Sequence, residues 1–327
     1  MIRLRNLAAT GVVAFVMLEL TARVYLFGPA GLNPIRIGSV RSIFHSGLLI
    51  PSESPKIGFE LRPNLDTWFK LARFRTNSRG LRDAEHSLPK PVGVFRVAVV
   101  GSSFTLPAGV EAEDAYHSRL EESFDRLFSP TRHEFVNFSV GAHHPLQTVA
   151  VLRERALAYQ PDLILFAVTR MAAGAMLHSR NLRVRQLEPA RHPGFRSFFW
   201  KLVSLRAGWV PTPGLVPELA PVSSKEAGLS AIERLAEMSA ESGIPLVIVR
   251  LEFMQPVESA TDRRLRQEAE RLGLLYVDTR SAFRDIDPHS LWIYELDPHP
   301  DARAHALFAQ ILGAYLRDQG LVGAPLR

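Results

Sequence analysis

From residue 95 onward, strand-like and helix-like stretches alternate five times, and this alternation limits the fold more than any other feature of the sequence. Short apolar runs rich in β-branched residues indicate buried parallel strands at 95–100, 135–140, 163–168, 245–251 and 274–277. Amphipathic patterns predict helices over 114–128, 146–159, 223–242, 262–272 and 302–317. The order predicts a three-layer α/β/α domain around a central parallel sheet of about five strands. Such sheets bind ligands at the carboxyl ends of their strands.

The composition is that of a packed globular protein, with 46% hydrophobic and 22% charged residues. The formal charge of +6, from 39 basic against 33 acidic side chains, is spread along the chain without a long run of one sign. This favours a solvated basic surface over a nucleic-acid platform, so we expect no nucleic-acid partner. The chain has no cysteine, which excludes disulfides, thiolate zinc sites and a cysteine nucleophile. We expect neither a metal site nor a cofactor.

The N-terminus carries a hydrophobic stretch that follows two arginines, Arg3 and Arg5. It runs over residues 7–27 and is interrupted only by Glu19 and Arg23, which lie four apart on one helical face. Its length is close to the ~20 residues that cross a bilayer, which favours an uncleaved signal anchor over a cleaved signal peptide. The two arginines would keep the N-terminus cytoplasmic. We therefore expect a single-pass protein of the inner (cytoplasmic) membrane, with the remainder in the periplasm.

Three regions follow from these patterns. Residues 1–28 form the anchor, residues 29–92 an extended lead-in punctuated by prolines, and residues 93–322 the α/β domain. An insertion at about 180–222 fits neither periodicity and holds several arginines and aromatic residues, among them Trp200 and Trp209. The insertion could be a lid, a membrane-contacting flap or a segment packed on the core.

Two turns of small residues follow the first two predicted strands. Gly101, Ser102 and Ser103 come directly after residue 100, and Gly141 comes directly after residue 140. A serine at a strand tip presents its hydroxyl at the active edge of the sheet, where the next turn can offer backbone N–H groups to an oxyanion. A glycine lets the backbone approach a substrate closely. Either pattern alone is also common in ordinary turns.

A candidate base lies near the C-terminus, in a predicted loop before the last helix. Asp297 and His299 are two residues apart there, and together they would supply a base for a serine nucleophile and an acid that orients it. A similar pair, Asp287 and His289, lies ten residues earlier, but no amphipathic helix follows it. We interpret the earlier pair as a surface loop.

Taken in order, these blocks resemble the SGNH, or GDSL-like, serine hydrolase superfamily, whose fold is flavodoxin-like. The chain looks most like bacterial membrane-anchored members that often serve cell-surface polysaccharide. The similarity spans most of residues 56–317 and is carried by 56–64, 76–82, 95–105, 137–141, 161–163 and 297–300. The resemblance implies that Ser103 is the nucleophile, His299 the base and Asp297 its orienter. It also implies that the backbone N–H groups of Ser103 and Gly141 hold the oxyanion.

The chain departs from the family pattern at two places. Ser102 replaces the aspartate of Gly-Asp-Ser, and residues 168–171 lack the asparagine whose amide usually donates to the oxyanion. Loss of one such donor typically costs roughly 10²–10³ in kcat. Thr169 or Arg170 could donate in its place. His143 and His144 follow Gly141, and we expect them, with Arg170, to contact the substrate.

The resemblance implies an esterase that removes an acyl group, most simply O-acetyl, from a carbohydrate or related ester through an acyl-serine intermediate. An O-acyltransferase acting on an extracytoplasmic glycan would use the same triad. A catalytically impaired glycan-binding or assembly protein is the third alternative, which the altered Gly-Ser-Ser and the missing asparagine favour. The expected partners are an acylated carbohydrate and, through the N-terminal helix, a membrane.

Overall fold

The computed structural model describes residues 2–169, 197–207 and 224–323. Its centre is a sheet of five parallel strands in the order β6-β5-β7-β8-β9. Their bounds are β5 Val94–Val100, β6 Arg132–Asn137, β7 Leu163–Val168, β8 Leu246–Arg250 and β9 Leu275–Asp278. This is the doubly wound order of flavodoxin-like folds, with its switch point between the first and third strands, here β5 and β7. The predicted parallel sheet is therefore confirmed.

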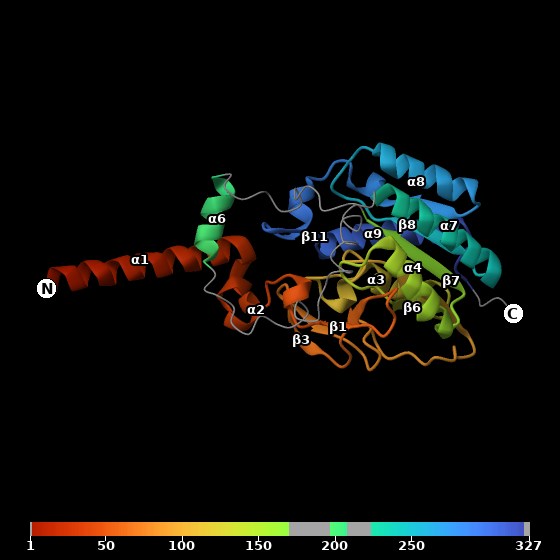
Figure 1. The fold of residues 1–327 in the computed structure, drawn as a ribbon, viewed down its shortest axis with the longest axis horizontal. Helices are drawn as coiled ribbons and strands as arrows, with labels where there is room; N and C mark the ends of the chain where they lie inside the picture. Colours follow the sequence, from red (N-terminus) through yellow and green to blue (C-terminus); the bar gives the residue numbers. More distant parts are fainter. Residues whose placement is uncertain (1, 170–196, 208–223, 324–327) are drawn as a thin grey trace.

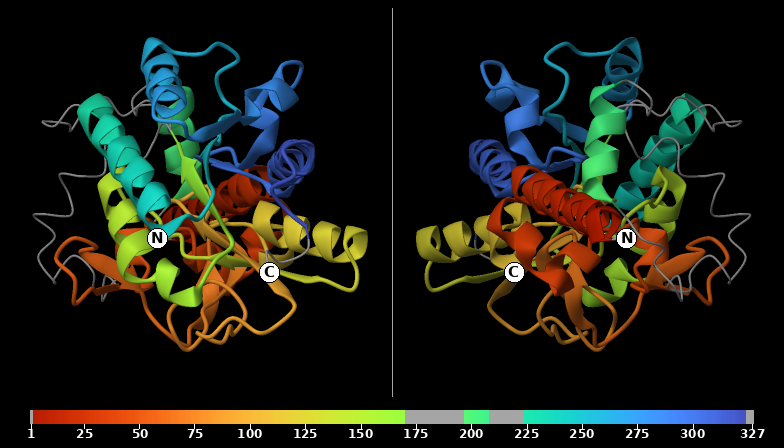
Figure 2. Two further views of the ribbon diagram at one scale, coloured as in Figure 1. Left: turned by 90° about the vertical axis from the view of Figure 1, so that its right-hand side faces the viewer. Right: turned by 90° about the vertical axis from the view of Figure 1, so that its left-hand side faces the viewer.

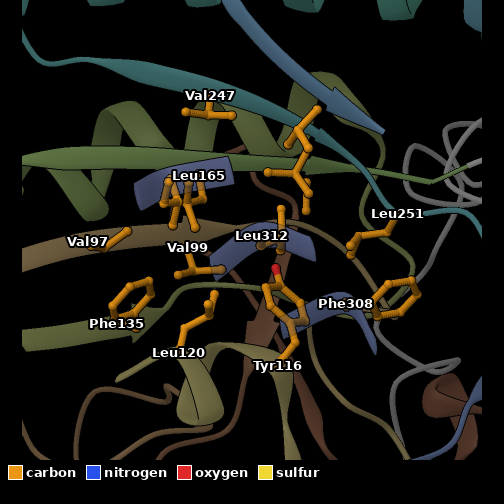
Figure 3. Close-up of a cluster of buried hydrophobic side chains, with 14 of the residues drawn as sticks. Val97, Val99, Tyr116, Leu120, Phe135, Leu165, Val247, Leu251, Phe308 and Leu312 are labelled. Carbon is orange, nitrogen blue, oxygen red and sulfur yellow. The ribbon is translucent and has the colours of Figure 1, made fainter. Parts of the chain in front are cut away.

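Helices cover both faces of the sheet (Figures 1 and 2). α3 (Tyr116–Leu127) and α9 (Ala302–Asp318) pack together on one face, and α4 (Pro145–Glu154), α7 (Ser224–Ser242) and α8 (Ala260–Arg271) on the other. Successive side chains of a strand point to opposite faces, so Val97 and Val99 join the α3–α9 core while Ala98 and Val100 join the other. Figure 3 shows part of the first core. The three-layer prediction is confirmed.

Short elements connect these layers. Within the described ranges, the short 3₁₀ helices are η1 Gly28–Leu32, η2 Ile43–His45, η3 Ala112–Asp114, η4 Ala156–Tyr159, η7 Thr279–Phe283 and η8 Pro288–Leu291. A small hairpin pairs β10 (Trp292–Tyr294) with β11 (Asp297–Pro300). The segment predicted as a loop before the last helix is thus an antiparallel strand, too short for any periodicity to reveal it.

The lead-in, predicted as an extended segment, folds into two small hairpins. β1 (Leu49–Pro51) pairs with β2 (Phe59–Leu61), and β3 (Asp66–Phe69) pairs with β4 (Ala72–Arg75). Their apolar residues form a buried cluster with Leu106 and Val140, from the turns that follow β5 and β6. The lead-in therefore covers the carboxyl ends of those two strands.

The N-terminal helix α1 (Ile2–Phe27) projects from the body of the protein (Figure 1). It is long and apolar enough to cross a membrane. Its last residues pack with α2 (Pro34–Gly38) and α6 (Phe198–Arg206) in a cluster that includes Leu26, Phe27 and Phe198. α6 belongs to the expected insertion, most of which, with Trp209 and Arg170, lies outside the described residues.

Candidate active site

A cavity of about 240 Å³ lies between the carboxyl end of β5 and the lead-in. Its polar lining residues are Ser42, Lys70, Ser102, Ser103 and His299, and Gly141 adds a backbone position in the turn after β6. Much of the remaining wall is apolar and is made by Ile43, Phe44, Phe69, Leu106, Ala108 and Ala142. The position at the carboxyl ends of β5 and β6 and the apolar wall make this cavity the candidate active site.

Ser103 occupies a sharp turn that the chain can make only because residue 101 is glycine. A Cβ atom on Gly101 would lie 2.4 Å from Thr105 Oγ1 and 3.1 Å from Ala167 Cβ. The turn is closed by the N–H groups of Thr105 and Leu106, which donate to the Ser102 carbonyl at 3.1 and 2.9 Å. Ser103 therefore stands at the tip of β5, on the cavity wall.

Gly141 is held in the turn after β6. Asn137, at the end of β6, accepts a hydrogen bond from Ser139 N–H at 3.0 Å and donates to the Thr105 carbonyl at 3.4 Å, which ties this turn to that of Ser103. Within residues 2–169, 197–207 and 224–323, neither Ser103 N–H nor Gly141 N–H donates to a protein acceptor. Two backbone donors on one cavity suit an oxyanion.

His299 and Asp297 lie on β11 and form a close pair. His299 Nδ1 contacts Asp297 Oδ1, and His299 N–H also donates to Asp297 Oδ1 at 3.2 Å. Because Nδ1 faces a carboxylate, the neutral ring carries its hydrogen there and leaves Nε2 as the basic atom. Phe104, the neighbour of Ser103, packs its ring edge to face with the imidazole at 5.8 Å. Within the described residues no hydrogen bond joins Ser103 to His299, and such bonds are often long in empty sites.

Lys70 is a functional candidate that the sequence reasoning missed. It lies in the two-residue turn between β3 and β4, where Lys70 and Leu71 adopt φ of 50° and 73°. Its Nζ lies 2.6 Å from Asp297 Oδ2 and 3.2 Å from His299 Nδ1. Ser39, just after α2, fixes this turn by accepting from Lys70 N–H at its carbonyl and from Leu71 N–H at its hydroxyl. No local sequence signal brings a lead-in lysine to a histidine 229 residues away.

The pKa values of Asp297 and His299 are both lowered in this cluster. Burial would raise the pKa of Asp297, but the His299 and Lys70 partners outweigh burial and lower it. Burial and the Lys70 ammonium lower the pKa of His299, and Asp297 offsets this only in part. The arrangement keeps Asp297 ionised and His299 neutral, which are the states that a general base and its orienting acid require.

Tyr294 connects this cluster to the N-terminal helix. Its hydroxyl donates to Asp297 Oδ2 at 3.3 Å, and its ring packs edge to face on Phe27 with 5.0 Å between centroids. Among the residues that the structure describes, Asp297 thus has three partners: His299 on β11, Lys70 in the β3–β4 turn and Tyr294 on β10.

The other predicted site residues lie elsewhere. His143 and His144 are 1% exposed and neither lines the cavity: His143 Nε2 bonds the Phe59 carbonyl at 2.9 Å, and His144 caps α4. Burial lowers the pKa of both to about 4. Thr169 lines a separate cavity of about 320 Å³ beside α7 and α8, where its Oγ1 has no partner within the described residues. Arg170 lies outside the described residues.

The earlier Asp-Pro-His sequence is remote from this chemistry. Asp287 and His289 pair with each other on η8, with side chains 69% and 66% exposed. Neither lines the Ser103 cavity. The described residues hold no cluster of three or more His, Asp or Glu side chains with the geometry of a metal site.

Comparison with known proteins gives matches in structure only. No family model and no curated protein matches the chain. Among solved structures it is similar to an α/β hydrolase from the metagenome of Lake Arreo, Spain, with 17% identity, a TM-score of 0.46 and coverage of 69% of this chain and 95% of that one. An acetyl xylan esterase from Geobacillus stearothermophilus gives 13% identity, a TM-score of 0.44 and coverage of 72% and 98%.

A two-domain esterase active on acetylated mannans gives 14% identity and a TM-score of 0.45, with coverage of 71% of this chain. The match spans about half of that protein, 51% of its length. At such identities and TM-scores the likeness assigns no reaction to this chain. The fold and the cavity themselves define a doubly wound α/β protein in which a serine and a histidine line one cavity at the carboxyl end of β5, with an aspartate paired to that histidine.

Proposed function

We propose that this chain is an SGNH-type serine esterase that acts through an acyl-serine intermediate. The observation that carries the proposal is the convergence of Ser103, Gly141 and His299 on one cavity. Asp297 contacts His299 at Nδ1, which leaves Nε2 as the basic atom. Each comes from a different part of the sequence, so only the fold brings them together. Ser103 is the nucleophile, His299 the base and Asp297 the residue that orients it.

In the first half-reaction the Ser103 hydroxyl attacks the ester carbonyl and passes its proton to His299 Nε2. The carbonyl oxygen becomes an oxyanion, which accepts hydrogen bonds from the N–H groups of Ser103 and Gly141. When the tetrahedral intermediate collapses, the bond to the alcohol breaks and the alcohol oxygen takes the proton from His299. The acyl group remains on Ser103.

In the second half-reaction a water molecule donates its proton to His299 and attacks the acyl-serine carbonyl. Collapse releases the carboxylic acid and returns the proton to Ser103. Lys70 does not exchange a proton in either half-reaction. It holds Asp297 in place and opposes protonation of His299 by its charge.

The substrate that we propose is an acylated carbohydrate, with O-acetyl as the simplest acyl group. The apolar side chains of Ile43 and Leu106 suit a short acyl group, because both line the cavity and leave no room for even a Cβ atom on Gly141. Several structurally similar proteins are named for acetylated polysaccharides, which makes this class the first to test. The proposal includes attachment to the inner membrane through α1, with the cavity on the periplasmic side.

The experiment uses the full chain in detergent and acetylated xylan or mannan oligosaccharides, with released acetate as the readout. Release that disappears in Ser103→Ala and persists in Ser102→Ala, its buried neighbour, would support the proposal. Acetate that moves to an added glycan acceptor instead of water would identify the acyltransferase that the same triad allows. Tight oligosaccharide binding with no turnover in folded protein would contradict the enzyme assignment.

A further inference from the structure

α1 changes at Glu19 from a fully exposed helix to one that is partly buried against the protein. Residues 5–18 are exposed, whereas Glu19, Ala22, Leu26 and Phe27 are buried against the rest of the protein. The apolar helix therefore divides into a free part and a part that belongs to the folded body. The sequence pattern, in which Glu19 interrupts the apolar run, falls at the same boundary.

The Glu19 carboxylate caps α6. It accepts hydrogen bonds from Ser197 Oγ at 2.9 Å and from the N–H groups of Phe198 and Phe199 at 3.1 Å. Arg23, one turn further along α1, donates its Nε to Glu19 at 2.9 Å. A carboxylate on the first N–H groups of a helix is a favourable cap, so α6 is fixed to α1 at this level.

Exposed apolar side chains gather where α1 meets the body. Outside α1, the large exposed apolar residues of the described ranges are Leu32, Ile35, Val92, Leu127, Trp200 and Val257. Three of these six, Leu32, Ile35 and Trp200, lie on η1, α2 and α6, the segments beside the buried end of α1. In Figure 1, α2 and α6 flank this end of the helix on two sides. Lys201 and Arg206 add two exposed cations, and Arg206 also contacts the Tyr25 hydroxyl at 2.7 Å and Glu295 at 3.3 Å.

We propose that this surface, formed by Leu32, Ile35, Trp200, Lys201 and Arg206 and named here the junction surface, binds the headgroup region of an anionic bilayer. Residues 2–18 would extend over ~25 Å at ~1.5 Å per residue, which is most of the ~30 Å thickness of the hydrocarbon. The Arg5 side chain, which is exposed, can extend to the opposite interface. Trp200 then sits where tryptophan is enriched in membrane proteins, and the cations meet lipid phosphate.

The same geometry packs the end of α1 into the folded protein. Phe27 packs its ring edge to face on both Phe198 and Tyr294, with 5.0 Å between centroids in each case. Removal of residues 1–28 would expose those two rings and leave α6 without the Glu19 cap. The bilayer is favoured over a protein partner because the junction surface continues directly from the exposed apolar part of α1.

The test exploits the absence of cysteine from the chain, since each single-cysteine variant carries one fluorescent label. The full chain is reconstituted in vesicles of phosphatidylcholine and phosphatidylglycerol that carry nitroxide lipids with shallow or deep spin labels. Ile35→Cys and Trp200→Cys probe the junction surface. Val13→Cys on the free part of α1 is the deep control, and Val257→Cys, 74% exposed on the body, is the aqueous control.

We expect the labels at 35 and 200 to be quenched several-fold more by the shallow than by the deep nitroxide. The label at 13 should be quenched more by the deep nitroxide than by the shallow one. The label at 257 should respond to aqueous iodide alone. If the labels at 35 and 200 behave like that at 257, the junction surface lies in water and the proposal fails. If they are shielded from both lipid nitroxide and iodide, a second copy covers them, which also overturns it. Neither outcome depends on the reaction at Ser103.

Discussion

Lys70 lies with its Nζ 2.6 Å from Asp297 Oδ2, although Lys70 belongs to the lead-in and Asp297 to β11, near the end of the sequence. The contact makes the β3–β4 hairpin of the lead-in part of the candidate site. Asp297 is thereby held on both carboxylate oxygens, by His299 on one and by Lys70 and Tyr294 on the other. The lead-in is therefore a structural requirement of the site as well as a connection to α1.

The first prediction concerns the pH dependence that Lys70 imposes. Burial and the Lys70 charge lower the pKa of His299, so the base stays neutral below its ordinary titration range and kcat/KM should fall only at more acidic pH. Lys70→Met removes the cation, raises the pKa of His299 and should move the acid limb of the kcat/KM profile to higher pH. Lys70→Arg keeps the charge and should leave the limb near its original position. An unmoved limb in Lys70→Met would mean that Lys70 only supports the structure.

The second prediction concerns Gly141. A Cβ atom there would lie 2.7 Å from Ile43 Cδ1 and 3.1 Å from Leu106 Cδ2, both on the cavity wall. Gly141→Ala should displace the oxyanion N–H and lower kcat by about 10²-fold, the usual effect of losing one such donor. Gly323→Ala, where an added Cβ meets nothing within 4 Å, is the matched control. Full ester turnover in Gly141→Ala would remove Gly141 from the mechanism.

The third prediction is a pH-dependent stability at Glu121 on α3, which accepts a hydrogen bond from Phe135 N–H at 2.8 Å. Burial, with the nearby Asp83 charge, raises the pKa of Glu121 to about 7 from an ordinary 4.5. The native state binds this proton more tightly than the unfolded state, so stability falls as pH rises from about 4.5 to about 7. The loss is at most roughly 3 kcal/mol.

Glu121→Gln keeps an acceptor for Phe135 N–H and removes the ionisation. The variant should melt at a higher temperature than the original protein at pH 8, and the difference should disappear at pH 4.5. Glu122→Gln, whose side chain is 71% exposed, should show no such dependence. Equal melting temperatures for Glu121→Gln and the original protein at pH 8 would refute the raised pKa.

The sheet and most of its helices could be predicted from sequence because their patterns are long and local. The run over residues 163–168 is continuous and apolar, and it forms β7 with those bounds. Gly101 and Ser103 could be placed at a strand tip because they directly follow the apolar run that forms β5. These features depend on neighbours along the chain.

The features that sequence reasoning missed depend on contacts distant in sequence. The β3–β4 turn has Lys70 and Leu71 at positive φ in place of the usual Asn-Gly. The sequence therefore contains no recognisable turn motif at this point. His143 follows Gly141 but is held inward by the Phe59 carbonyl of the lead-in, a contact 84 residues away. Thr169 leaves β7 towards the α7–α8 side, and its position in the sequence carries no sign of that direction.

The central claim is that Ser103 is an activated nucleophile, and labelling of the full chain with a fluorophosphonate probe tests it most directly. The account predicts covalent labelling that is lost in Ser103→Ala and in His299→Ala. It also predicts that labelling persists in His289→Ala, which alters the exposed histidine of the earlier Asp-Pro-His sequence. Absence of labelling in folded protein, or labelling that survives Ser103→Ala, would contradict it.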